Sequence, residues 1–339
     1  MNRTKGHGDR TRRGFLRTAA VGCAAAALPN AWGVDAARRI ELILAPSSLG
    51  LRPDAGVEPG AWRAPEVLMA AGLETRLGAA RVVALPHPRY RIEAEAGTRI
   101  RNGHAIRAFS LEIAGAARAA LERGAIPLVI GGDCSVLLGA LYGARLAGAR
   151  GLVHVDGHSD FFHPGNYDTA SRLGSVAGMD LALATGRGED LLARWPDIDG
   201  PLVADDDAVQ AGERDELAPG QYYGDILGTR ITRWSMQRIA AIGLETAARE
   251  LVTRLAARAL SRVWLHIDLD VLDEKTMPAV DSPGSPGFTF ERLAEFLAAL
   301  HGSGRIVGAT VTIYDPERDP GARHAPSIVA LLARVFRAA

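Results

Sequence analysis

The sequence predicts an α/β domain built around a mainly parallel β-sheet. Short runs of aliphatic and β-branched residues at 126–130, 152–155 and 263–267 are typical of strands that are buried on both faces. Apolar residues recur at helical spacing in 111–123 and 291–300, which predicts helices that pack against such a sheet. Strand and helix patterns alternate along the chain without a linker, so we expect one large domain.

Each of the three predicted strands runs directly into a short polar cluster. The clusters are Gly131-Gly132-Asp133-Cys134-Ser135, Asp156-Gly157-His158-Ser159-Asp160 and Asp268-Leu269-Asp270. Because ligands collect beyond the carboxyl ends of strands in an open parallel sheet, we expect the clusters to meet although they are far apart in sequence. Side chains alternate along an extended chain, so Asp156, His158 and Asp160 can converge, and so can the two aspartates of the last cluster.

So many carboxylate and imidazole groups in one pocket would repel one another or lose solvation unless a cation lay between them. The clusters therefore predict a hydrolytic site that holds two divalent metal ions. The alternative is that three unrelated loop or capping carboxylates follow these strands, because a single Asp-x-Asp at a strand end usually marks only a solvated loop.

Composition argues against several other classes of function. The chain has 339 residues, of which 47% are hydrophobic, a formal net charge of zero and a pI of about 7.1. A balanced charge without a basic stripe argues against a nucleic-acid partner. No apolar run reaches the roughly 20 residues that a membrane span needs. The composition is typical of an ordinary soluble enzyme.

The amino terminus differs in character from the rest of the chain. The motif Thr-Arg-Arg-Gly-Phe-Leu-Arg at 11–17 precedes a short, Ala-rich, uncharged stretch and resembles a twin-arginine signal peptide. We expect residues 1–36 to be this signal, cleaved after Ala36 or near Gly33, and residues 37–339 to form the mature domain. A periplasmic or secreted location follows, with the twin-arginine (Tat) export machinery as a partner that carries the protein folded.

The chain has two cysteines. Cys23 lies within the apolar part of the signal, where lipidation is the alternative to a plain signal peptide. Removal of the signal leaves Cys134 as the only thiol, so no intrachain disulfide can form in an oxidising compartment. Burial or metal ligation would protect this thiol, and its place in the first polar cluster allows both.

The clusters and their surroundings resemble the ureohydrolase family, which comprises arginases, agmatinases and their relatives. The similarity begins with Leu-Ala-Pro-Ser at 44–47 and Gly-Val-Glu-Pro-Gly at 56–60, and runs through the three clusters. It continues to Met-Pro-Ala at 277–279 and Thr-Ile-Tyr-Asp-Pro at 312–316. The resemblance implies an arginase-like three-layer α/β/α fold, a small guanidino or amidino substrate, hydrolysis of a carbon–nitrogen bond, and assembly as a homotrimer or homohexamer.

The resemblance also implies two manganese ions and assigns their ligands by motif. One ion would be held by Cys134, Asp156, Asp160 and Asp268, and the other by Asp156, His158, Asp268 and Asp270. The two metal ions would lower the pKa of a water molecule, which would attack the planar carbon of the guanidino or amidino group. We expect Asp160 to help pass a proton from this water to the departing amine.

Four positions depart from the family pattern. Cys134 stands where most members have histidine, and its softer thiolate favours zinc, iron, cobalt or nickel over manganese. If this thiol is merely buried, the site would hold one metal. Ala177 stands where arginases carry a proton-shuttling histidine. Ile313 replaces a glutamate that pairs with the guanidinium, and Phe162 replaces an asparagine that meets the amino-acid end of arginine. The expected substrate is therefore an amidine other than, or less polar than, arginine.

Three further histidines bear on the site. His163, three residues after Asp160, is the best replacement for the missing shuttle, and a surface loop histidine is the alternative interpretation. His154 and His266 each lie two residues before a predicted ligand aspartate, so they point along the same strand face but deeper in the sheet. We interpret both as hydrogen-bonded core histidines, with direct metal ligation as the alternative.

The sequence leaves two classes of function open. The favoured class is a metal-dependent hydrolase of a linear amidine. The rival is a non-catalytic metal- or ligand-binding protein of the same fold, which the missing shuttle histidine and glutamate would suit. The retained bridging carboxylates favour the enzyme. A one-metal amidohydrolase of the histone-deacetylase kind is a further relative of the fold, but it lacks the second-site carboxylates that are present here.

Overall fold

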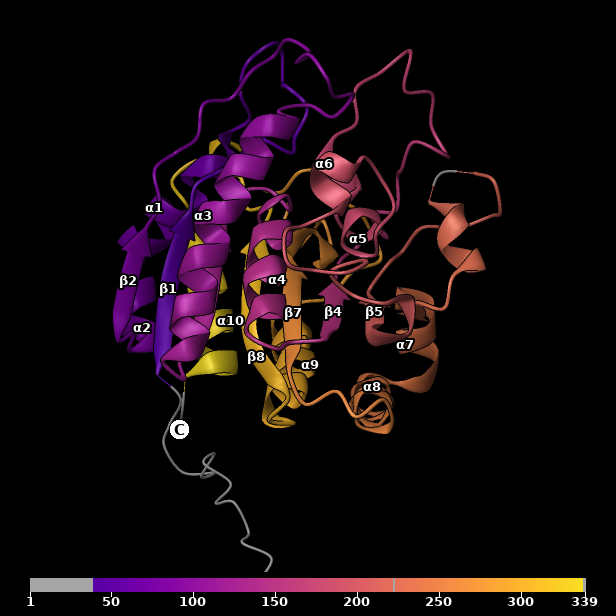
Figure 1. Ribbon diagram of the computed structural model, residues 1–339. Coiled ribbons are helices and arrows are strands. Elements are labelled where there is room, and N and C mark those ends of the chain that lie inside the picture. The colour runs from indigo at the N-terminus through magenta and orange to yellow at the C-terminus, as the bar shows by residue number, and fades with distance from the viewer. Residues whose placement is uncertain (1–38, 222, 338–339) are drawn as a thin grey trace, which may run out of the picture. The chain divides into compact units, whose positions relative to one another are not determined.

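One eight-stranded sheet organises the residues that the computed structural model describes, which are 39–221 and 223–337 (Figure 1). The strand order is β2-β1-β3-β8-β7-β4-β5-β6, and every neighbouring pair in these residues is parallel. The strands are β1 (Ile40–Ala45), β2 (Arg81–Ala84), β3 (Ile126–Gly131), β4 (Gly151–Val155), β5 (Ala208–Ala211), β6 (Thr232–Trp234), β7 (Val263–Asp268) and β8 (Ile306–Thr312). The predicted mainly parallel sheet is confirmed.

Helices cover both faces of this sheet and give three layers, as predicted (Figure 1). One face carries α3 (Gly103–Glu122), α4 (Val136–Leu146), α5 (Asp180–Ala184) and α6 (Asp190–Ala193). The other face carries α1 (Ala64–Ala70), α2 (Leu73–Leu77), α7 (Met236–Ile242), α8 (Leu244–Ala257), α9 (Phe290–Gly302) and α10 (Ala325–Phe336). Short 3₁₀ turns are η1 (Gly60–Arg63), η2 (Val176–Gly178), η3 (Asp205–Asp207), η4 (Gly224–Gly228), η5 (Leu269–Val271) and η6 (Pro316–Arg318).

Two apolar layers hold the sheet between its helices. Side chains alternate along each strand, so neighbouring residues join opposite layers. On β1, Leu42 packs into the layer beneath α1, α2 and α10, whereas Ile43 and Ala45 pack into the layer beneath α3 and α4. Because the inner strands are buried on both faces, their sequences are nearly continuous apolar runs. These runs end where the polar clusters begin, which fixes the clusters at the carboxyl edge of the sheet.

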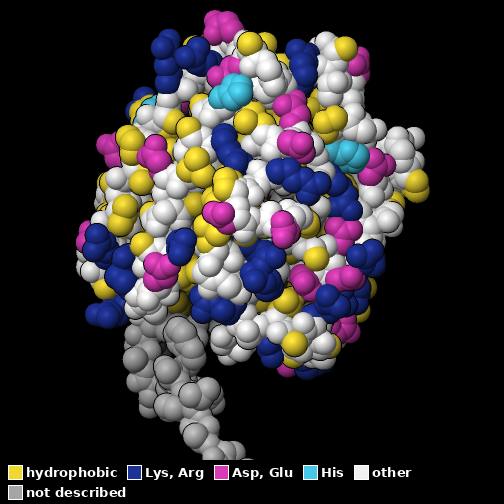
Figure 2. All heavy atoms as spheres, viewed as in Figure 1, with side chains coloured by type: hydrophobic (Ala, Val, Ile, Leu, Met, Phe, Trp, Pro, Cys, Tyr) yellow, Lys and Arg dark blue, Asp and Glu magenta, His cyan; other side chains and the backbone are white. Residues whose placement is uncertain are grey.

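The surface of the face that carries α3 and α4 is mixed in charge. Acidic and basic side chains are interspersed across it (Figure 2). This distribution agrees with a formal net charge of zero for the whole chain. In the described ranges, no helix combines the length and the apolar character that crossing a membrane requires. The predicted twin-arginine signal at 1–36 lies outside the described residues, so the signal and the domain boundary stay predictions.

One ion pair at the start of the sheet gives a testable pH dependence. The Arg123 guanidinium donates two hydrogen bonds, of 3.0 and 2.6 Å, to the Glu41 carboxylate. These bonds hold the pKa of Glu41 below its ordinary value of 4.5. A carboxyl group whose pKa is lower in the folded state than in the unfolded state stabilises the fold fully at a pH above its unfolded-state pKa. This contribution is lost as the pH falls through its folded-state pKa.

We therefore expect Glu41→Gln to lower the free energy of unfolding at pH 7 by about 1 kcal/mol, a figure kept small because Arg123 is partly exposed and screened. The difference from wild type should shrink as the pH falls below 4.5 and disappear once the pH has passed the lowered pKa of Glu41 in the folded state. Denaturant unfolding at several pH values measures it. Glu122→Gln is the matched control, because the pair of Glu122 with Arg118 is exposed on both sides and its loss should cost a few tenths of a kcal/mol at most. Equal effects of both substitutions would contradict the prediction.

Candidate metal centre

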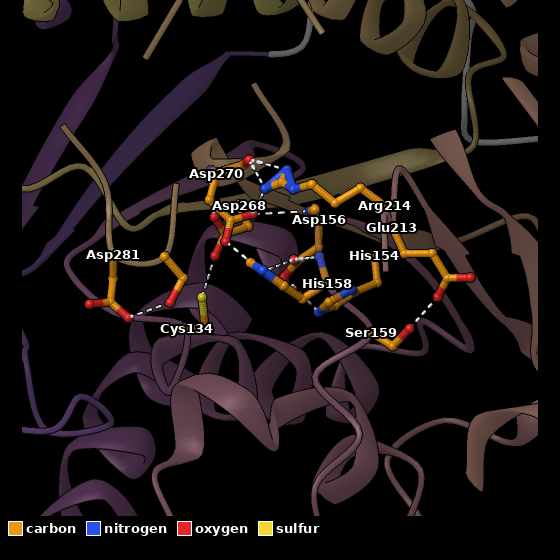
Figure 3. A network of polar contacts seen from close by, with 12 residues as sticks. Cys134, His154, Asp156, His158, Ser159, Glu213, Arg214, Asp268, Asp270 and Asp281 are labelled. Atoms are coloured by element: carbon orange, nitrogen blue, oxygen red, sulfur yellow. Dashed lines mark hydrogen bonds and ion pairs between the residues drawn. The ribbon is translucent and has the colours of Figure 1, made fainter. Parts of the chain in front are cut away.

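The polar clusters meet at one edge of the sheet, where β3, β8, β7 and β4 end. β8 lies between β3 and β7, so the three predicted strand ends are not all neighbours, and a fourth strand contributes to the edge. In Figure 3, Cys134 and His158 approach the Asp156 and Asp268 carboxylates from different sides. Five groups of the described residues have donor atoms within 4.8 Å of one another, and two of these groups are Cys134, Asp156, His266 and Asp268, and Asp156, His158 and Asp270.

The turn after β3 is fixed by Asp133. Its carboxylate accepts hydrogen bonds from Ser47 Oγ at 2.7 Å and from the Ser135 backbone nitrogen at 2.8 Å. Gly132 lies so close to the Ser47 carbonyl oxygen that a Cβ at this position would collide with it. The glycine and the aspartate of the first cluster therefore hold the loop that presents the next residue, Cys134.

Cys134 is fully buried at the junction of β3, β7 and β8. Its thiol donates a hydrogen bond to Asp268 Oδ2 at 2.7 Å, and Sγ lies 3.3 Å from Thr312 Oγ1. Burial and the neighbouring Asp268 raise the pKa of this thiol well above its ordinary value. A bound divalent ion would reverse this balance, because a coordinated thiol is deprotonated. The contact of Thr312 with Cys134 was not predicted from the sequence, because it depends on the order of the strands.

Backbone amides orient the aspartates of the other two clusters. The His158 nitrogen donates to Asp156 Oδ1 at 2.6 Å, and the Asp270 nitrogen donates to Asp268 Oδ1 at 2.7 Å. Both bonds join a side chain to the amide two residues later, as in an Asx turn. The His158 ring then reaches across to Asp270, with Nδ1 at 2.8 Å from Oδ2. The short spacings in the sequence thus produce a cluster with fixed geometry.

Arg214 supports this cluster from behind, a role that sequence analysis did not predict. Its Nη1 donates to the Asp270 carbonyl oxygen at 2.8 Å, and Nη2 lies 3.6 Å from Asp270 Oδ1. The Gly157 nitrogen donates to the same carboxylate oxygen at 3.0 Å. A Cβ on Gly157 would overlap the Arg214 guanidinium, so the glycine is required for this close approach.

The electrostatics of the cluster call for a cation. Burial and repulsion from Asp270 raise the pKa of Asp156 to about 7 and raise the pKa of Asp268 well above its ordinary value. Burial opposes the charged form of His158, but Asp270 raises the pKa of this histidine to about 9. Asp156 Oδ2 is buried without a hydrogen-bond partner. Such a group of carboxylates, with an imidazole and a thiol among them, fits divalent metal ions.

Asp160 and His163 occupy different surroundings. Asp160 is buried, with a backbone φ of +44°, and its carboxylate lies within 4.8 Å of donor atoms of Cys134 and Asp180. Burial and repulsion from Asp156 raise the pKa of Asp160 well above its ordinary value. His163 does not line the cavity described below, and its Nε2 lies 3.2 Å from Asp225 Oδ2. Its role as a replacement shuttle stays a prediction.

The polar cluster forms the floor of a cavity of about 500 Å³. His158, Asp160, Asp268 and Asp270 reach this floor, and the wall includes Phe162, Tyr167, Tyr223, Ala177 and Ile313. Ile313 is held at a φ of +75°, which is rare for a β-branched residue, by a hydrogen bond of 2.6 Å from its nitrogen to the Gly132 carbonyl oxygen. An apolar side chain is thereby fixed beside the floor.

Comparison with known proteins accounts for this combination of sheet, cluster and cavity. The sequence model of the arginase family matches residues 39–337. The chain belongs to the arginase family. Proteins of this family are hydrolases that depend on a pair of metal ions, and the buried cluster of the chain fits that requirement. The family assignment confirms the predicted kinship with arginases, while the individual ligand assignments stay predictions.

Individual relatives within the arginase family are distant. Human arginase-1 is 28% identical over 290 residues, which cover 82% of this chain and 85% of the relative. The structure of arginase from Bacillus caldovelox matches with a TM-score of 0.78 at 25% identity, over 89% of this chain and 99% of that one. Formimidoylglutamase from Bacillus subtilis matches with a TM-score of 0.67 at 18% identity, over 90% and 88%, and shares the fold.

Proposed function

We propose that this protein is a two-metal hydrolase that cleaves a carbon–nitrogen bond in a guanidino or amidino compound less polar than arginine. The observation that carries the proposal is the position of the buried ligand cluster at the floor of a cavity with an aromatic wall. The proposal includes export by the twin-arginine route to the periplasm and assembly as a homotrimer or homohexamer, both of which rest on the sequence alone.

The residues present would divide the chemistry between them. Cys134, Asp156, Asp160 and Asp268 would hold one ion, and Asp156, His158, Asp268 and Asp270 the other. Two divalent ions there supply Lewis acidity that makes water nucleophilic near neutral pH. Manganese is the family's usual ion, and the Cys134 thiolate would suit zinc, iron, cobalt or nickel better.

The proton relay is assigned to Asp160. Its carboxylate lies at the floor of the cavity, within reach of both the ligand cluster and a bound substrate. Asp160 has two carboxylate oxygens, so the oxygen that does not bind the ion can accept a proton. It would take a proton from the attacking water and deliver it to the departing amine, which leaves as a neutral molecule.

The cavity wall argues for an apolar substrate tail. The Phe162 and Tyr223 rings lie 4.5 Å apart, and the Arg172 guanidinium sits 4.9 Å from the centre of Phe162 and 4.8 Å from that of Tyr167. Aromatic faces of this kind contact both planar cations and aliphatic chains. Ile313 adds a further apolar surface and offers no carboxylate. The Phe162 and Ile313 side chains offer the amino-acid end of arginine no hydrogen-bond partner, so that end would lose solvation beside them without an equivalent gain.

We expect n-butylguanidine or n-pentylguanidine to be hydrolysed with a kcat/KM at least about tenfold higher than that of arginine, because desolvation of a polar group beside Phe162 and Ile313 costs about 1–3 kcal/mol, which an alkyl chain avoids. Urea release from the metal-loaded protein across a panel of guanidino compounds measures this. Phe162→Asn should lower the ratio of kcat/KM for the alkylguanidine to kcat/KM for arginine. Tyr167→Phe is the matched control, since it keeps the aromatic face and should leave this ratio unchanged. Faster hydrolysis of arginine than of every alkylguanidine would contradict the proposed specificity.

A second function, that of a non-catalytic binding protein, is favoured by one observation. Ala177, which stands where arginases carry the shuttle histidine, lines the cavity without a titratable group. His163, the best candidate to replace that histidine, is in contact with Asp225. Two bound ions together with no urea or amine release from any compound of the panel would establish the binding protein and exclude the hydrolase.

A further inference from the structure

A second polar cluster lies beneath the proposed metal pair, deeper in the sheet. His154 on β4 and His266 on β7 stand opposite each other in register, and their rings stack with centroids 4.8 Å apart and planes 25° apart. Asp180, the first residue of α5, faces both rings. All three side chains are completely buried. His154 also lies beside Asp156, which belongs to the cluster above (Figure 3).

His154, Asp180 and His266 each offer a donor atom that lies within 4.8 Å of the others, close enough for one ion to draw them together. His154 Nε2 lies 3.2 Å from Asp180 Oδ1 and 3.6 Å from Asp156 Oδ2, and His266 Nε2 lies 3.6 Å from Asp180 Oδ2. Two ligand atoms that each lie about 2.1 Å from a tetrahedral ion are about 3.4 Å from each other. Direct ion pairs between imidazolium and carboxylate groups are shorter, at roughly 2.7–2.9 Å.

Several of these donor atoms lack a hydrogen-bond partner. Asp156 Oδ2, Asp180 Oδ2 and His266 Nε2 are buried and make no hydrogen bond, although buried polar atoms are nearly always satisfied. The other ring nitrogen of His266, Nδ1, lies 2.7 Å from Thr310 Oγ1. If Nδ1 donates that bond, the lone pair of Nε2 is directed toward Asp180, as in histidines whose distal nitrogen is fixed by a neighbour.

We propose that His154, His266 and Asp180 hold a further divalent cation, with both carboxylate oxygens of Asp180 available as ligands. A donor set of two imidazole nitrogens and two carboxylate oxygens suits zinc or a similar transition-metal ion. None of the three lines the cavity, so the site is closed and structural rather than catalytic. The ion ties α5 to β4 and β7.

Binding of an ion at this site can be tested without measuring hydrolysis. The simplest alternative without an ion is an Asp180 carboxylate that bridges the two rings, with Oδ1 at 3.2 Å from His154 Nε2 and Oδ2 at 3.6 Å from His266 Nε2. With an ion in place, Asp180 Oδ2 and His266 Nε2 bind the ion instead of each other. The two arrangements differ in the number of ions bound, which can be counted whether or not the protein hydrolyses an amidine.

The test is elemental analysis of the mature protein after loading with zinc and removal of free metal. We expect about three equivalents per chain in the wild type and about two in His266→Asn and in Asp180→Asn. His104→Asn, at an exposed histidine far from the site in sequence, is the matched control and should keep the wild-type count. Circular dichroism checks the fold of each variant.

Two equivalents or fewer in the wild type would overturn the proposed site, and this count stands even if a variant fails to fold. Undiminished counts in both folded variants would overturn it as well. The hydrolase proposal fails separately. A protein that binds three ions and releases no urea or amine from any guanidino compound would sink the hydrolase and leave the deep site in place.

Discussion

Asp268→Ala should remove bound metal and turnover together. Asp268 Oδ2 accepts the hydrogen bond from the Cys134 thiol, and Oδ1 accepts the bond from the Asp270 nitrogen, so this carboxylate lies between the two proposed ion positions. Its loss takes one ligand from each ion. Because groups outside the coordination sphere already cost 10–100-fold when removed, we expect activity to fall by at least about 100-fold.

Elemental analysis and urea release on the same preparation measure the effect of this substitution. Asp281→Asn is the matched control, since Asp281 lines the cavity but lies apart from the cluster in Figure 3, and it should retain the metal content of the wild type. Full metal occupancy in Asp268→Ala would show that the assigned ligands are wrong. Loss of metal with unchanged turnover would show that the ions do not serve the reaction.

Cys134→His should change which metal the protein prefers. The thiolate is the one soft donor among the proposed ligands, whereas an imidazole is borderline and tolerates manganese. We expect the affinity for Mn²⁺ relative to Zn²⁺ to rise at least about tenfold in the variant. Equilibrium dialysis against a mixture of the two ions measures the ratio directly.

Cys134→Ala controls for the larger volume of histidine in a fully buried position, where overpacking costs roughly 1–3 kcal/mol. It removes the thiol without adding volume, and it should weaken zinc binding without improving manganese binding. An unchanged metal ratio in both variants would mean that Cys134 is a buried thiol and not a ligand, which is the one-metal alternative raised by the sequence.

The outline of the fold and the position of the cluster followed from local patterns. Runs of apolar residues at 126–130, 152–155 and 263–267 marked the strands, and parallel strands bring their carboxyl ends to one edge. The spacing of two residues in Asp156-Gly157-His158 and in Asp268-Leu269-Asp270 also allows a backbone amide to donate the hydrogen bond that orients each carboxylate. These features depend on residues that are neighbours in sequence, so they could be predicted from the sequence.

Contacts that depend on the order of the strands or on the paths of loops could not be predicted from the sequence. β8 enters the sheet between β3 and β7, and only that order places Thr312 beside Cys134. Asp180 reaches His154 through a long connection that has no periodic pattern, so nothing local linked the two residues. The direction of His163 toward Asp225 depends on the path of a segment some sixty residues later. Each of these pairs is set by tertiary packing rather than by spacing.

The most direct test of the central claim is anomalous diffraction from crystals of the metal-loaded protein, recorded at the absorption edge of the bound element. Two peaks at the cavity floor are expected, with Asp156 and Asp268 reaching both ions, and with Cys134 at one ion and His158 at the other. The claim would be contradicted by an empty cluster under loading conditions that saturate the protein elsewhere, with the carboxylates bonded only to one another.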